Sequence, residues 1–177
     1  MIKEPLMTLG CAALLAVAAA CAATGACIAG SREDAGGGAP ARMPDKVRDA
    51  WRAEVRFPNG RLIAAEIADT PDRWERGYMF RREVRDGEGM VFVFPEPAFR
   101  PFWMKNTLVP LDIIWMDEQR TIMHIEASTP PCKADPCLIY GPLLKAATVL
   151  EVRAGTVAAA GLKVGDRLQI SIPQLGD

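Results

Sequence analysis

The sequence has a single histidine, His124, among its 177 residues. A Ser-His-Asp or Cys-His catalytic arrangement would have to use this residue, which lies in the middle of an expected strand, where a lone histidine usually has a structural role. Phosphate-binding loops, nucleotide-binding fingerprints and metal-binding signatures are also absent, so we expect no cofactor and no metal. Lysine and arginine number 21 against 22 aspartates and glutamates, a formal net charge of −1. This balance gives nucleic acid no general attraction to the chain.

The N-terminal segment, residues 1–21, has the pattern of an export signal. A short basic start is followed by an uncharged stretch from Pro5 to Gly30 that contains the apolar run Leu14–Ala20, which is the pattern of a secretory signal. The sequence Ala18-Ala19-Ala20-Cys21 resembles a bacterial lipoprotein lipobox, with Ala18 at a position where leucine is preferred. Three outcomes stay open: lipidation of Cys21, an uncleaved membrane helix, and cleavage to a free form. We expect an exported protein of the periplasm or cell envelope, held at a membrane by this segment.

Residues 22–50 have the composition of a tether. They include Gly36-Gly37-Gly38 and Ala39-Pro40 among mixed charges, and such a segment cannot bury enough apolar surface to order itself. A flexible chain of this length would hold the following domain roughly 30 Å from a membrane.

Residues 51–177 are expected to form one mainly β domain of six to seven short, mostly antiparallel strands with one or two short helices. Short apolar or alternating runs separated by turn residues indicate a sandwich or a partly closed barrel. Helices are expected from Pro71, preceded by the capping hydroxyl of Thr70, to Gly77, and over Thr156–Gly161. The expected strands are Arg52–Phe57, Arg61–Asp69, Met90–Phe94 (ended by Pro95), Asp112–Asp117, Thr121–Ala127, Thr148–Arg153 and Arg167–Ile172.

Two cysteines of the domain, Cys132 and Cys137, flank four residues of a proline-containing loop. A metal site normally adds further cysteine or histidine ligands, and a redox pair usually has two intervening residues. In an oxidising compartment a structural disulfide is the simpler interpretation.

The segment Phe102–Ile114, with the sequence FWMKNTLVPLDII, resembles the hallmark of the domain of unknown function 192 family. The resemblance extends over about residues 54–172, with Tyr78 at a position where leucine is more usual. It implies a mostly β, sandwich-like fold in small, often exported proteins, and it implies no established activity, cofactor or catalytic residue. Supporting blocks are Glu75–Met79, Gly89–Phe94, Cys137 with Tyr140, Val149–Glu151, Ala154-Gly155 and Gly165-Asp166.

The hallmark allows two interpretations. In the first it is a folding motif, in which Asn106 and Asp112 bond to backbone groups and fix a turn while Lys105 pairs with Asp112. In the second it forms a shallow cleft for a sugar or an anionic group, with Trp103 or Tyr140 as a stacking face. Hydrogen-bond donors in such a cleft would be Lys105, Asn106 and Arg76. We expect Trp103 to be mainly a packing residue, because it is flanked by Phe102 and Met104.

Two functions of different classes follow. The first is a non-catalytic envelope module that binds a glycan, a small molecule or a protein from its tether, since no nucleophile–base set is recognisable. The second is a small envelope hydrolase or transferase with Asp112 or Glu151 as the base and Lys105 or Arg76 as the charge stabiliser. Convergence of Lys105, Asn106, Asp112 and Arg76 in one concave, water-accessible pocket would favour the enzyme.

Overall fold

The computed structural model describes residues 52–172. The expected signal segment (1–21), the lipidation candidate Cys21 and the tether (22–50) lie outside these residues. Between residues 52 and 172, no helix is long and apolar enough to cross a membrane.

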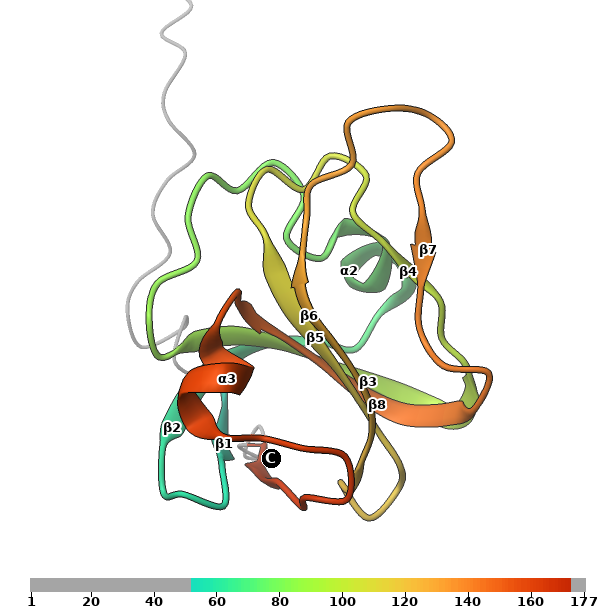
Figure 1. The fold of residues 1–177 in the computed structure, drawn as a ribbon. Helices are drawn as coiled ribbons and strands as arrows, with labels where there is room; N and C mark the ends of the chain where they lie inside the picture. The colour runs from blue at the N-terminus through green and yellow to red at the C-terminus, as the bar shows by residue number, and fades with distance from the viewer. Residues whose placement is uncertain (1–51, 173–177) are drawn as a thin grey trace, which may run out of the picture. The chain divides into compact units, whose positions relative to one another are not determined.

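A seven-stranded sheet forms the framework of the domain, in the order β6-β5-β8-β3-β2-β1-β9 (Figure 1). Neighbouring strands are antiparallel except for the parallel pair β2 and β3, whose crossover connection contains helix α2, Pro71–Arg76. Parallel neighbours require such a crossover because a tight hairpin can join only antiparallel strands. The strands are β1 Arg52–Arg56, β2 Leu62–Ala68, β3 Glu88–Phe99, β5 Leu111–Met116, β6 Ile122–Thr129, β8 Lys145–Arg153 and β9 Gln169–Ser171.

A small second sheet and a short helix lie beside this sheet. Strands β4, Phe102–Trp103, and β7, Ile139–Tyr140, pair with each other as a small second sheet. Helix α3, Thr156–Ala160, is linked to the β1–β2 turn by a hydrogen bond from Asn59 to the carbonyl of Ala160. The mainly β fold with two short helices confirms the fold class expected from the sequence.

The ends of the large sheet approach each other without closing a barrel. The segment before β9 meets the start of β6 through an isolated bridge between Thr121 and Arg167. The amide of Ile122 donates to the Asp166 carbonyl at 2.8 Å, and the amide of Leu168 donates to the Arg120 carbonyl at 3.0 Å. The curved sheet therefore has an enclosed face and an outer face.

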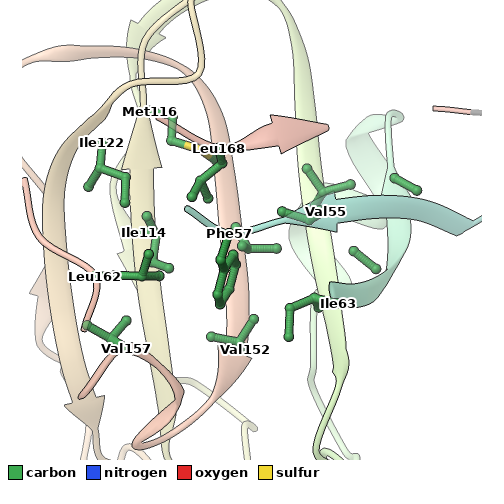
Figure 2. Close-up of a cluster of buried hydrophobic side chains, with 14 residues drawn as sticks. Val55, Phe57, Ile63, Ile114, Met116, Ile122, Val152, Val157, Leu162 and Leu168 are labelled. Carbon is green, nitrogen blue, oxygen red and sulfur yellow. The ribbon is translucent and has the colours of Figure 1, made fainter. Parts of the chain in front are cut away.

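Each face of the sheet carries its own apolar cluster. In the first cluster, side chains from β1, β2, β5, β8 and the segment 157–168 point toward one another (Figure 2). The second cluster includes Phe92 of β3, Trp115 of β5 and Val149 of β8. Because neighbouring residues of a strand point to opposite faces, β5 is buried along its whole length: Ile114 and Met116 belong to the first cluster, and Ile113 and Trp115 to the second.

Two local predictions are wrong. Pro95 does not end its strand, because β3 continues to Phe99 and its pairing with β8 shifts register between Val93 and Ala98. This irregularity lets proline, which lacks an amide hydrogen, lie within the strand. Thr70 precedes α2 in an extended conformation, as an N-cap residue does, but its side chain forms no capping hydrogen bond.

Candidate functional site

A cleft of about 250 Å³ opens on the outer face of the sheet, in the region of the second cluster. The helix α2 and the turn after it, the end of β3, and β4 supply most of its walls, and β8 supplies Glu151. Seven of its fifteen lining residues are aromatic, so rings supply a large part of its wall. The lining residues are Trp74, Glu75, Arg76, Gly77, Tyr78, Met79, Phe92, Phe94, Phe99, Arg100, Pro101, Phe102, Trp103, Thr107 and Glu151.

Glu151 places a buried carboxyl group in this cleft. It lies in β8, a central strand, between Met90 of β3 and Ile113 of β5. The residue is 4% exposed, and its Oε2 atom has no hydrogen-bond partner among the described residues. Burial raises the pKa of this carboxyl to about 8, and the charge of Arg81 opposes the rise. Strongly perturbed carboxyls in clefts are candidates for binding or acid–base chemistry.

Gly77 faces this carboxyl from the turn after α2. A Cβ atom at this position would lie 3.5 Å from Glu151 Oε2 and 3.4 Å from Phe92 Cζ. The φ angle of Gly77 is 42°, a region that residues with a side chain rarely adopt. Glycine therefore both ends the helix and leaves the space next to the carboxyl unfilled.

Contacts among the rings hold the walls of the cleft in place. Phe102 meets Phe92 edge-on with ring centroids 4.9 Å apart, and it meets Trp115 at 5.6 Å in the same manner. Trp74 lies 5.2 Å from Phe94 and donates through Nε1 to the Ala68 carbonyl at 3.0 Å. Edge-to-face and tilted geometries are the favoured ones for aromatic pairs, so these rings form a preorganised surface.

A second polar group of residues lies next to Glu151. Arg81 donates two hydrogen bonds to Glu66, at 2.5 and 2.7 Å, and its guanidinium lies 5.0 Å from the centroid of the Tyr78 ring. Burial, followed by the charge of Glu151, raises the pKa of Tyr78 well above its ordinary value. Tyr78 is therefore neutral over the working pH range, and Arg81 is already bound to another carboxylate.

Of the residues chosen from the sequence, Arg76 and Trp103 line the cleft. Trp103 is 41% exposed, so the expectation that it is mainly a packing residue is wrong. Successive strand residues point to opposite sides, and in β4 it is Phe102 that packs on the second cluster. Tyr140 pairs with Phe102 in the small sheet and also packs on that cluster.

Lys105 and Asn106 lie at a separate hollow of about 190 Å³ beside the 132–137 loop. The Nζ atom of Lys105 is 3.9 Å from Asp135 Oδ1 and 5.3 Å from the centroid of the Trp103 ring. The backbone carbonyl of Asn106 accepts a hydrogen bond from the amide of Phe80 at 2.8 Å. The structure therefore does not bring these two side chains into one cleft with Arg76.

Asp112 is fully buried and is bonded to backbone groups. Its Oδ1 accepts from the amides of Ser128 (2.7 Å) and Gly155 (3.2 Å), and its Oδ2 accepts from the amide of Val157 (2.8 Å). The expected pairing of Lys105 with Asp112 is wrong, because three backbone amides surround this carboxylate instead. Asp112 does bond to backbone groups, as the folding-motif interpretation expects, but the three amides belong to segments distant in the sequence and not to a local turn.

The sulfurs of Cys132 and Cys137 lie 2.08 Å apart, at the disulfide distance expected from the sequence. His124 lies in β6, as expected, and its Nε2 is 2.8 Å from Glu126 Oε1. Over residues 52–172, no group of three or more histidine, cysteine, aspartate or glutamate side chains is placed to hold a metal ion.

Sequence reasoning missed most of the cleft. The sequence indicates Glu151 only as one of two possible bases, and it does not indicate Gly77, Tyr78 or Phe92 as site residues. One signal was present: Glu151 is the only charged residue in the run Thr148–Val152, which is otherwise apolar after its first residue. A charged residue in a buried central strand is rare unless it is paired or functional.

Most of the cleft lining comes from segments that carry the family resemblance, namely Glu75–Met79, Gly89–Phe94, Phe102–Ile114 and Val149–Glu151. Comparison with known proteins shows the family itself. The family model of DUF192, described as an uncharacterized ACR, matches residues 54–170. The chain therefore belongs to this family.

Two solved structures are similar to the chain, each at 34% sequence identity over 67% of it. One is a protein of unknown function from Novosphingobium aromaticivorans DSM 12444, with a TM-score of 0.58 and 83% of its own chain covered. The other, from Sinorhizobium meliloti 1021, is described as a candidate transcription regulator and has a TM-score of 0.59 with 92% covered. No protein with a curated description matches the chain significantly.

Proposed function

We propose that this protein is an exported, membrane-tethered binding module that holds a small ligand in the aromatic cleft next to Glu151. The observation that carries the proposal is the buried Glu151 carboxyl, whose Oε2 atom has no partner among residues 52–172. A buried polar atom without a hydrogen bond costs about 1–3 kcal/mol. A ligand that supplies the missing partner recovers this free energy, and the ring surfaces of the walls add apolar contact.

The size of the cleft restricts the ligand. Its volume of about 250 Å³ lies just below the range of roughly 300–1,000 Å³ that is usual for drug-sized compounds. A small metabolite or a single sugar ring fits this space. The export signal pattern and the glycine-rich segment before the domain support presentation of the cleft in the cell envelope.

A thermal-shift screen of the full-length protein against small metabolites and monosaccharides tests the proposal. Compounds that bind the cleft raise the melting temperature of the wild type, and Trp103→Ala weakens this effect because it removes an exposed ring from the wall. Val164→Ala is the matched control, since Val164 is 60% exposed and lies away from the cleft lining. Hits that stabilise the Trp103 variant and the wild type equally would contradict the proposal.

A second candidate function is a small hydrolase or transferase, favoured by the pKa of about 8 of Glu151. A carboxyl whose pKa lies near neutrality suits general acid–base catalysis. Asp112, the other carboxylate considered, is bonded to three backbone amides outside the cleft. The test is whether the wild type hydrolyses glycoside or ester substrates. If it does, and Glu151→Gln abolishes this activity, the protein is an enzyme and not a binding module.

A further inference from the structure

We infer that the cleft recognises an organic ammonium ion, a small protonated amine whose nitrogen donates to Glu151 while the aromatic walls surround its carbon skeleton. The inference rests on the proposed binding function and adds the chemical class of the ligand. Glu151 Oε2 is a hydrogen-bond acceptor without a partner in the described part of the chain, and an ammonium group has only donors to offer.

The aromatic lining favours a cation over a neutral donor. Trp74, Phe92, Phe94, Phe102 and Trp103 are among the rings that line the cleft, and the faces of such rings attract cations within about 6 Å of their centroids. One such cation–π contact is present in the protein itself, since the guanidinium carbon of Arg100 lies 4.0 Å from the centroid of the Phe94 ring. A ligand cation next to the other rings would gain in the same way.

No cation among the described residues is hydrogen-bonded to Glu151 Oε2. Arg81 is the cation whose field acts on Glu151, but it donates both of its hydrogen bonds to Glu66. Glu151 Oε2 receives no hydrogen bond from Arg81, Tyr78 is neutral, and Met90 and Ile113 flank Glu151 with apolar side chains.

The remaining charged groups of the cleft lining are one carboxylate, Glu75, and two guanidinium groups, Arg76 and Arg100. Glu75 and Arg76 are exposed neighbours of opposite charge. The guanidinium of Arg100 is stacked on Phe94 and donates to the Glu96 carbonyl at 2.9 Å. A ligand ammonium therefore supplies the direct hydrogen-bond donor that Glu151 Oε2 lacks.

Binding of this kind releases a proton. Below pH 8 the Glu151 carboxyl is mostly protonated, and the ammonium group pairs with the ionised form. The carboxylic acid and the ammonium ion combine to give a carboxylate–ammonium pair and one free proton. Affinity therefore rises about tenfold per pH unit between pH 6 and pH 7 and levels off above pH 8, until the amine loses its own proton. A neutral ligand that accepts a hydrogen bond from protonated Glu151 would show the opposite trend.

Calorimetric titration of the full-length protein with 2-phenylethylamine, beside its neutral isostere 2-phenylethanol, tests the inference. We expect the amine to bind with release of nearly one proton at pH 7, measured in two buffers of different ionisation enthalpy. We expect the alcohol to bind more weakly and without the rise of affinity between pH 6 and pH 8. Glu151→Gln should weaken amine binding at least tenfold and abolish proton release, whereas the exposed control Glu118→Gln should leave both unchanged.

Two outcomes overturn the inference. One is an amine that does not bind, or binds equally well to Glu151→Gln. The other is an alcohol that binds as tightly as the amine, with affinity falling above pH 8. Neither outcome removes the proposed binding function, which fails separately if no compound of the thermal-shift screen depends on the cleft.

Discussion

Replacing Glu151 by glutamine removes the ionisable group of the cleft with almost no change of shape. The carboxyl is 4% exposed between Met90 and Ile113, so its ionised form is poorly solvated in the folded protein. Glutamine cannot ionise and carries no such cost. The two proteins should therefore differ in how their stability depends on pH.

The size of the pH effect on wild-type stability follows from the pKa of Glu151 in the folded and unfolded states. Its ordinary value of 4.5 is raised to about 8 by burial, so between these pH values the folded protein binds more protons than the unfolded chain. Stability consequently falls as the pH rises from about 4.5 to about 8 and is constant above that. Each pH unit in this interval costs up to about 1.4 kcal/mol, which amounts to about 5 kcal/mol over the whole interval.

Urea denaturation of the wild type and Glu151→Gln between pH 5 and pH 9 measures this difference. We expect similar stabilities near pH 5 and a variant more stable by several kcal/mol above pH 8. Glu118→Gln, at an exposed position of the β5–β6 turn, serves as the control and should follow the wild type. If the free energies of unfolding of the wild type and Glu151→Gln instead change with pH in parallel over the whole range, burial does not raise the pKa of Glu151, and the expectation is refuted.

Three other predictions concern residues outside the cleft. Asp112→Ala leaves three backbone amides without their acceptor and should lower the free energy of unfolding by about 3 kcal/mol or more; a loss below 1 kcal/mol in urea denaturation would contradict this. Lys105→Ala should cost less than about 1 kcal/mol in the same assay, because the ion pair with Asp135 is exposed, and a drop of several kcal/mol would show a buried role instead. Cys21→Ser should release the protein from the membrane fraction after cell fractionation, whereas unchanged membrane association would favour an uncleaved helix.

The local pattern of the sequence predicts most of the fold. The hairpin of β1 and β2 and the hairpin of β5 and β6 follow from alternating runs around turn residues. The limits of α2 follow from Pro71 and Gly77. These features depend on neighbours in the chain, so the sequence contains the information directly. The small pair of β4 and β7 was not predicted, because each strand has only two residues.

The cleft depends on contacts between distant segments, which a single sequence does not specify. Glu151 meets Gly77, Met90 and Ile113 only after β8 is inserted between β3 and β5. The pairing expected between Lys105 and Asp112 relied on their proximity in sequence, but the carboxylate of Asp112 points to the amides of Ser128, Gly155 and Val157. Closeness in the sequence therefore does not predict the hydrogen-bond partners of Asp112.

The most direct test of the binding function is to map by nuclear magnetic resonance where small molecules bind to the isotope-labelled, full-length protein. We expect amine-containing compounds to perturb the amides around Gly77, Trp103 and Glu151. Amides of the first cluster, such as those of Ile114 and Leu168, should remain unchanged. Perturbations confined to the hollow beside the Cys132–Cys137 loop, or no perturbation by any compound, would contradict this expectation.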